Sequence, residues 1–426
     1  MSSARGLEIV LVYDCRYPDS LGGAERWLGA LARELARRGA TVTYIHGARR
    51  GVAESEGVRW VGLMDRSHLY TGAGVRRMVP AALFAWHLAG HLRKYRTADL
   101  VYVHDMPILP VFAAAWTLRG RRTRWVVEWI EWWDAAYWRG YAGTVTGTIG
   151  YLLQRWALRL SPVAVCSTRT VAAMLTSARP GMPVIRLPGL ATLHAADVAP
   201  AAAARGPGVR AVYLGRLVPH KGALLAVAAM AAAAARYPLT GLVIGSGPEA
   251  ASVHAEIARL GMTGVIEVLS DADDERVRAE LRRADVLIHP SVREGFGLVV
   301  VEANAQGVPV VLLAAPDNAA VELLGPDGAG GVAVPWTGRA DDDVRSLTAG
   351  VATVLAAGAA GRAAALVNAR RLATTATVER SAEMIWRLAT RRQLLPLPPS
   401  RPSGSRVKSR QDSARTPDRS NDSPPP

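Results

Sequence analysis

Short apolar segments alternate with helical stretches along most of this 426-residue chain, and the alternation runs through two rounds. The segments are continuously apolar, which is typical of strands in a parallel sheet that helices cover on both faces. The repetition therefore predicts an α/β protein with two doubly wound sheets. The expected strands are residues 8–13, 41–46, 100–104, 125–130 and 163–166, then 210–214, 242–244, 265–269, 286–289, 308–313 and 332–334.

A stretch with little pattern separates the two rounds. It runs from Pro188-Gly189 to the Gly-Pro-Gly of residues 206–208, and such residues interrupt regular structure. We expect an N-terminal domain at 1–192, a linker at 193–208, a C-terminal domain at 209–376 and a terminal helix at 377–395. The 31 residues from Pro396 hold 8 Pro and 7 Ser, which predicts a disordered tail over 396–426.

Positive charge is concentrated in the first half of the chain. Residues 1–190 carry a net charge of +12, residues 191–395 none, and residues 396–426 carry +3. Such a domain attracts phosphates, nucleic acid or an anionic membrane face. An arginine-rich composition without any such partner is the alternative, since the chain has only three lysines.

Cysteine content and hydropathy indicate the compartment. Cys15 and Cys166 are too few for a disulfide framework or a thiolate zinc site, which fits a reducing compartment. No secretory signal is visible, and the apolar stretches near 79–92 and 224–235 fall short of the ~20 residues that span a bilayer. We expect a cytoplasmic protein that could act at the inner membrane face.

The most informative segment is residues 293–303, with the sequence REGFGLVVVEA. Glycines on both sides of Phe296 let the backbone approach a ligand closely. A helix is expected from Gly297 to about Gly307, and its N-terminus suits an anion. Glu302 would be buried in this apolar run, where an unpaired acid is costly, so we expect it to bind a ribose diol. A buried helix with one stray acid is the alternative.

A second segment, residues 215–222 with the sequence GRLVPHKG, follows an expected strand and opens a helix. Arg216 offers a planar fork of donors and Lys221 a compact charge, and together they suit a diphosphate. Two solvated loop cations are the alternative.

Together these segments resemble the retaining glycosyltransferases of family 4, which have the GT-B fold of two Rossmann-like domains facing a central cleft. Glu294 and Glu302 match the family's E-x7-E pattern, and residues 215–222 match its G-R-L-x-x-x-K-G turn. Three more segments follow the family order: GGAE at 22–25, GSGPE at 245–249, and PDNAA at 316–320 with Glu322. The resemblance covers roughly residues 7–390.

The resemblance implies roles for individual residues. Arg216 and Lys221 would hold the donor diphosphate, and Glu302 the ribose. Gly22 and Gly23 would shape the cleft floor near the phosphates and the acceptor. The terminal helix would return to the N-terminal domain. The transferred sugar would be held by Glu294 and by the backbone of Gly295, Phe296, Gly297 and Leu298.

One departure from the family concerns the cleft histidine. Similar relatives have His-Glu-x-Trp after a first-domain strand, whereas residues 130–133 here are Ile-Glu-Trp-Trp. Glu131 survives, and it or another group takes over the role, unless the histidine served only for orientation. His104 and Asp105 are expected to end a strand at the acceptor side of the cleft, although a capped surface pair is the stronger interpretation.

Two further patterns are ambiguous. Asp271 and Asp273 have the D-x-D form of a metal site, but capping of the helix expected over 275–283 explains them better. The resemblance also implies that no metal and no cofactor are required. A tryptophan-rich run could stack a sugar, touch a membrane interface or pack the cleft mouth. It comprises Trp125, Trp129, Trp132, Trp133 and Trp138, with Tyr137 and Tyr141.

The function expected from these patterns is retaining transfer of a sugar from a UDP- or GDP-linked donor to a hydroxyl acceptor. The acceptor could be a lipid phosphate, a cell-wall or exopolysaccharide chain, or a secondary metabolite, and no nucleic acid partner is expected. A GT-B nucleotide-sugar epimerase and a non-catalytic nucleotide-sugar binder are the alternatives. A Rossmann dehydrogenase is disfavoured, because no G-x-G-x-x-G follows the first strand.

Overall fold

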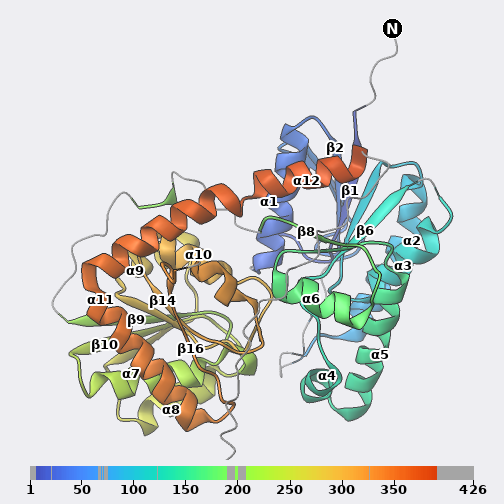
Figure 1. The fold of residues 1–426 in the computed structure, drawn as a ribbon. Helices are drawn as coiled ribbons and strands as arrows, with labels where there is room; N and C mark the ends of the chain where they lie inside the picture. Colours follow the sequence, from blue (N-terminus) through green and yellow to red (C-terminus); the bar gives the residue numbers. More distant parts are fainter. Residues whose placement is uncertain are drawn as a thin grey trace, which may run out of the picture.

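The structure is a computed structural model that describes residues 6–20, 22–65, 69, 71, 75–121, 123–189, 197–199, 208–325 and 327–390. The predicted tail at 396–426 and most of the predicted linker at 193–208 lie outside these residues. The predicted domain boundaries therefore stay predictions. The two rounds of the sequence form two sheets that lie side by side (Figure 1).

The first sheet has the strand order β3-β4-β2-β1-β5-β6-β7-β8, and all of its pairs are parallel except β3 with β4. Its central strands β1 and β5 are almost wholly buried, as their continuous apolar runs predict. The elements are β1 (Glu8–Val12), α1 (Gly23–Arg37), β2 (Thr41–His46), β3 (Gly51–Ser55), β4 (Val58–Gly62), α2 (Met78–His91), η1 (Leu92–Tyr95), β5 (Leu100–His104), α3 (Leu109–Leu118), β6 (Arg124–Glu128), α4 (Ala135–Ala142), α5 (Thr144–Leu160), β7 (Ala164–Cys166), α6 (Arg169–Ala178) and β8 (Val184–Arg186).

The second sheet is wholly parallel, with the order β11-β10-β9-β12-β14-β16, which is the doubly wound order of a Rossmann-like domain. A separate two-stranded ladder joins β13 to β15. The elements are β9 (Val209–Leu214), η3 (Pro219–Lys221), α7 (Ala223–Ala234), β10 (Leu239–Ile244), α8 (Ala250–Arg259), β11 (Ile266–Leu269), α9 (Asp274–Arg283), β12 (Val286–His289), β13 (Arg293–Glu294), α10 (Leu298–Ala305), β14 (Val310–Leu313), β15 (Asp317–Asn318), η4 (Ala319–Leu324), β16 (Gly331–Val334), α11 (Ala340–Thr375) and α12 (Val378–Thr390).

The strands that sequence analysis missed are very short, exposed or interrupted by a charged residue. Every residue of β3 is exposed, and β8 has only three residues, so neither carries a strong apolar run. β4 is mostly buried, but Arg59 interrupts its apolar sequence. β13 and β15 have two residues each. These elements depend on pairing with neighbours more than on local sequence.

The terminal helix α12 leaves the C-terminal half of the chain and lies beside α1 (Figure 1). Arg38 donates a hydrogen bond to Glu383 at 2.6 Å, and Arg124 donates to the carbonyl oxygens of Leu388 and Ala389, both at 2.9 Å. Ser381 donates to the carbonyl oxygen of Gly189 at 2.7 Å. α12 is therefore attached to the first sheet's domain.

The longest apolar helix is α11, which sequence analysis did not name beside 79–92 and 224–235 as a candidate membrane span. Among the described residues, it alone is long and apolar enough to cross a membrane by length and composition. A core helix passes the same test, and α11 packs against α7, β14 and β16. Non-helical backbone at Gly358 also divides it. We draw no membrane span from it.

Candidate active site

The two predicted site segments meet at one edge of the second sheet. β9 and β12 are parallel neighbours in that sheet, so the loops after their carboxyl ends emerge together. Ligands of doubly wound sheets bind outside this edge. The segment after β9 carries Arg216 and, in η3, Lys221, and the segment after β12 carries Glu294 in β13. Helix α10 follows with Gly297 at its N-cap, where φ is 95° and glycine is favoured.

Glu294 binds two groups through one oxygen. Lys221 Nζ donates to Glu294 Oε2 at 2.6 Å, and His289 Nε2 lies 3.0 Å from the same atom. Burial opposes ionisation of Glu294, but Lys221 and His289 outweigh it and hold its pKa well below the usual range. Glu294 therefore stays ionised at neutral pH, next to the backbone of Gly295.

Arg216 is the exposed cation of this edge. Its carbonyl oxygen accepts a hydrogen bond from Tyr213 at 3.0 Å, which fixes the backbone of the turn. Its guanidinium forms no ion pair with any residue that the structure describes, so its donors are available to a ligand. Burial, with the charges of Lys221 and Arg216, lowers the pKa of His220 to about 3, so this ring is neutral. The turn thus presents two cations and one neutral imidazole.

Glu302 lines a pocket of about 200 Å³ between α1, α9 and α10. Contrary to expectation, its side chain is exposed to solvent, whereas Val299, Val300 and Val301 are buried. Glu302 lies one turn after Leu298 on the same face of α10, and both residues line the pocket. Desolvation by the surrounding protein raises its pKa, although Arg26 opposes this. The expected burial of Glu302 is therefore wrong, and its donor-binding role stays a prediction.

Arg26 closes one side of this pocket and joins the two domains. Its guanidinium donates two hydrogen bonds to Asp274, both at 2.5 Å. Arg26 lies on α1 and Asp274 on α9, 248 residues apart in the chain. The charge of Glu302 favours the cationic form of Arg26. Sequence analysis missed Arg26, and its only signal was its place one turn after Gly22 and Gly23.

The glycines at the start of α1 approach the second domain, and the first domain approaches residues 295–298, which we call the donor loop because the resemblance assigns them to the donor sugar. A Cβ added to Gly23 would lie 2.9 Å from Leu298 Cδ1, so the first turns of α1 and α10 face one another. A Cβ on Gly295 would lie 2.5 Å from both Ile130 Cγ2 and Ile130 O, and 3.0 Å from Glu131 Cγ. The structure therefore places Ile130 and Glu131 against the donor loop, where the resemblance puts the family's histidine and its neighbouring acid.

The aromatic run forms the wall between Glu131 and the loop after β9. Trp133 Nε1 donates to Glu131 Oε2 at 2.8 Å, and the Trp133 ring packs against Tyr137, Trp138 and Tyr141. The Tyr137 hydroxyl lies 3.1 Å from His220 Nδ1. Much of the run therefore packs at the cleft. Trp129 is fully buried, and Trp125 lines a separate pocket.

Arg293 is a second interdomain residue that sequence analysis did not single out. It is buried, donates to the carbonyl oxygen of Trp132 at 2.9 Å, and forms an ion pair with Asp317. Its guanidinium also stacks on the Tyr137 ring at 4.2 Å. Three groups from both domains thus fix the residue that immediately precedes Glu294. Its signal was adjacency to the E-x7-E pattern.

Two further residues that sequence analysis named, His104 and Asp273, make contacts within their own domains. His104 is buried rather than exposed, stacks on Tyr13 at 4.3 Å, and has described contacts only within the first domain. The capped surface pair is therefore wrong, and the acceptor role stays a prediction. Asp273 accepts a hydrogen bond from the backbone N–H of Arg276 at 2.7 Å, which confirms the N-cap.

These features define the GT-B class: two Rossmann-like domains whose helix N-termini and carboxyl-end loops face one another. The sequence model described as "Glycosyltransferase Family 4" matches residues 21–187, and the model described as "Glycosyl transferases group 1" matches residues 202–335. The chain belongs to the family 4 glycosyltransferases of the GT-B fold.

Related proteins that match shorter segments of this chain are glycosyltransferases by name. A 2-deoxystreptamine glucosyltransferase of Streptomyces kanamyceticus is 32% identical over 174 residues, which are 37% of this chain and 44% of that protein. A D-inositol 3-phosphate glycosyltransferase of Kribbella flavida is 34% identical over 168 residues, 36% of this chain and 38% of that protein. Each match thus spans less than half of the relative.

A solved structure matches nearly the whole fold. Sucrose-phosphate synthase of Thermosynechococcus elongatus superposes with a TM-score of 0.74 at 20% identity, covering 90% of this chain and 98% of that one. This structural match extends over both domains, whereas the sequence matches to the two relatives cover shorter segments.

Proposed function

We propose that the protein is a retaining glycosyltransferase that moves a sugar from a nucleoside-diphosphate sugar to a hydroxyl acceptor. One observation carries the proposal: the Lys221–Glu294 ion pair and the exposed Arg216 lie together at the carboxyl edge of the second sheet. This edge offers cations for a leaving diphosphate and a fixed carboxylate for sugar hydroxyls.

The leaving group is stabilised by charge. As the bond from the sugar C1 to the diphosphate oxygen breaks, negative charge grows on that oxygen. Arg216, Lys221 and the free N–H groups at the start of α10 are the groups that meet it. Glu294 holds the sugar hydroxyls, and Glu302 the ribose diol. No metal ion takes part in this scheme.

Retention needs no carboxylate nucleophile in this scheme. The acceptor oxygen bonds to C1 on the face that the diphosphate leaves, and the acceptor proton passes to the departing phosphate oxygen. The C1–oxygen bond that forms replaces the one that breaks, so no other reactant is needed. Glu131 lies beside the donor loop, where it can orient the sugar or the acceptor.

Relatives support an acceptor that is a small polyol or its phosphate. The relatives act, by name, on 2-deoxystreptamine and on inositol 3-phosphate. The net charge of +12 on residues 1–190 also suits a phosphate-bearing acceptor. UDP and GDP are the proposed carriers, and the cytoplasm is the proposed location.

The second candidate is a nucleotide-sugar binder without turnover. It is favoured by Ile130, an apolar residue against Gly295 where the family resemblance puts a histidine. A thermal-shift panel of UDP and GDP sugars tests both candidates, since a ligand that binds the folded state raises the melting temperature. The stabilising donor is then incubated with candidate acceptors. Release of diphosphate and an NMR spectrum with the donor's anomeric configuration support transfer. Stabilisation without release supports the binder, and no stabilisation contradicts both.

A further inference from the structure

Exposed apolar side chains gather on one face of the N-terminal domain. Among the described residues, nine of the twelve large apolar side chains with high exposure lie on α2, α3 and α5. These helices are neighbours, because α3 packs against both α2 and α5. The nine, which we call the apolar face, are Met78, Val79, Leu83, Trp86, Trp116, Val145, Ile149, Leu152 and Trp156.

On α5, the residues of the apolar face recur at the period of a helix, so they lie along its solvent-exposed side. Along α5, Val145, Ile149, Leu152 and Trp156 recur at spacings of four, three and four residues, which forms one stripe. Trp86 on α2 is 79% exposed and Trp116 on α3 is 83% exposed. Patches of this kind on soluble domains mark interaction surfaces.

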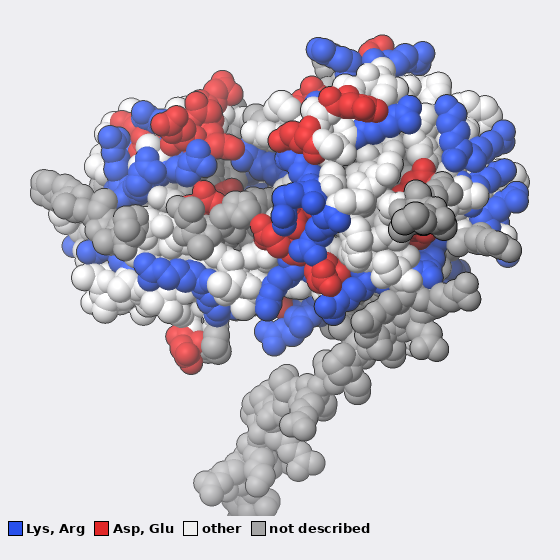
Figure 2. Space-filling view, turned by 90° about the horizontal axis from the view of Figure 1, so that it is seen from above, with Lys and Arg blue, Asp and Glu red and all other residues white. Residues whose placement is uncertain are grey.

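The charges on and near α2, α3 and α5 indicate which kind of partner binds the apolar face. No Asp or Glu occurs between residues 66 and 98, between 106 and 127, or between 135 and 196, which are the segments that contain the three helices. The cations there are numerous, and Figure 2 shows Lys and Arg along the end of the molecule where this domain lies, with few acids among them. Helical segments that are apolar and basic and carry no acids complement an anionic surface.

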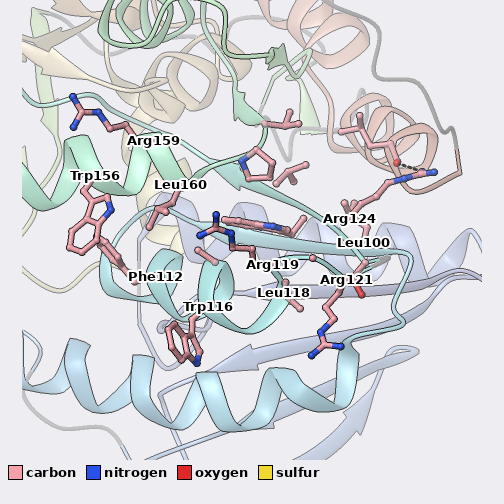
Figure 3. A pocket seen from close by; sticks show the side chains of 18 residues that line it. Leu100, Phe112, Trp116, Leu118, Arg119, Arg121, Arg124, Trp156, Arg159 and Leu160 are labelled. Atoms are coloured by element: carbon pink, nitrogen blue, oxygen red, sulfur yellow. Dashed lines mark hydrogen bonds between the residues drawn. The ribbon is translucent and has the colours of Figure 1, made fainter.

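Three arginines lie at one edge of the apolar face. A pocket of about 1140 Å³ opens between the C-terminal ends of α3 and α5, lined by Trp116, Trp156 and exposed Arg119, Arg121 and Arg159 (Figure 3). None of these three arginines forms an ion pair with a described residue. Tryptophan beside arginine is the composition of a membrane interface, since both have apolar bodies and polar tips.

We propose that the apolar face and its arginines dock the enzyme on an anionic lipid surface. The tryptophans and aliphatic side chains of α2, α3 and α5 enter the boundary between head groups and acyl chains, and Arg119, Arg121 and Arg159 bind lipid phosphates. Helix α5 begins directly after α4, whose Tyr137 contacts His220 in the cleft. The docked surface thus extends toward the candidate active site. This inference goes beyond the proposed function and does not depend on it.

Co-sedimentation with vesicles tests the proposal without donor or acceptor. The full chain is mixed with vesicles of phosphatidylcholine alone or with phosphatidylglycerol. We expect binding to the anionic vesicles that weakens at high salt, and much weaker binding to the neutral ones. Each arginine near an anionic surface contributes about a fivefold change in affinity, so Arg119→Glu/Arg159→Glu should weaken binding about 25-fold or more.

Matched variants separate this face from the rest of the surface. Arg236→Glu/Arg282→Glu makes the same charge change at exposed sites of the C-terminal domain and should bind much more like the unmodified protein. Trp86→Ser/Trp116→Ser should also weaken binding, with Trp336→Ser as its control. Equal binding to neutral and anionic vesicles would overturn the proposal, as would equal loss in the control variants. Self-association that the tryptophan pair abolishes, without vesicle binding, would assign the face to a second copy instead.

Discussion

Lys221 Nζ and His289 Nε2 contact the same oxygen of Glu294, at 2.6 Å and 3.0 Å. Lys221 comes from the turn after β9, and His289 ends β12, so two neighbouring parallel strands fix one carboxylate. The second carboxylate oxygen is left to accept other donors. A sugar hydroxyl bound there would meet a group whose charge and position are set before the ligand arrives.

Glu302→Gln should weaken binding of the nucleotide sugar by ~1–3 kcal/mol, the scale of a lost charged hydrogen bond. The amide fills the same volume, so the pocket between α1, α9 and α10 keeps its shape. Isothermal titration with the donor measures the change. Glu267→Gln, the same substitution at an exposed site of β11, is the control. Equal affinity in both variants would remove the ribose assignment.

Two glycine substitutions should differ in cost. The Cβ of Gly295→Ala would meet the backbone oxygen of Ile130 at 2.5 Å, whereas that of Gly23→Ala would meet the end of the Leu298 side chain at 2.9 Å. A backbone atom cannot move aside cheaply, so Gly295→Ala should lose ~1–3 kcal/mol of stability and Gly23→Ala less. Denaturant unfolding measures both. A larger loss for Gly23→Ala would contradict the described approach of the domains.

The buried carboxyl group of Glu128 should make the free energy of unfolding depend on pH. Burial raises its pKa to about 7 from 4.5, although Trp27 donates to it at 2.8 Å. Between about pH 4.5 and pH 7, Glu128 is therefore protonated in the folded protein and ionised in the unfolded chain. The stabilisation is complete below pH ~4.5 and is lost as pH rises through 7, by about 3 kcal/mol in total. Glu128→Gln should flatten this dependence and unfold at higher denaturant than the unmodified protein at pH 8. An unchanged slope between pH 5 and 8 would refute the assignment.

Turnover should survive EDTA. Asp273 caps α9, and no group of three or more His, Cys, Asp or Glu among the described residues could hold a metal ion. We expect the same rate of diphosphate release before and after chelation. A loss of turnover that Mg²⁺ or Mn²⁺ restores would show that a metal takes part.

The sequence predicted what depends on local pattern. The strands 41–46, 100–104 and 286–289 have the predicted bounds, because buried parallel strands are continuous apolar runs. Sequence analysis did not predict β3, because this strand is wholly exposed and is defined by its pairing with β4 at the sheet edge rather than by an apolar run. Glu302 was placed in the site, but its exposure depends on the pocket that α1 and α9 form around it.

The contacts between domains could not be predicted from local sequence. Arg26 and Asp274 are 248 residues apart, and neither belongs to a motif that sequence analysis singled out. Glu322 was known only as part of a motif, yet it accepts hydrogen bonds from the Thr170 backbone N–H at 2.7 Å and hydroxyl at 2.8 Å, at the start of α6 in the other domain. Such pairings follow from how the two sheets face each other.

The central claim is that Arg216 and Lys221 stabilise the leaving diphosphate, and steady-state release of nucleoside diphosphate by their variants tests it most directly. Arg216→Ala and Lys221→Ala should each lower kcat/KM by ~10²–10³, with the loss in kcat as well as in KM. Arg216→Lys should restore little, because an ammonium lacks the bidentate fork. The double variant should lose less than the product of the two losses, since both groups act on one oxygen cluster. If both single variants fold, by circular dichroism, and keep nearly full kcat, the two residues are solvated loop cations and the account of this site is wrong.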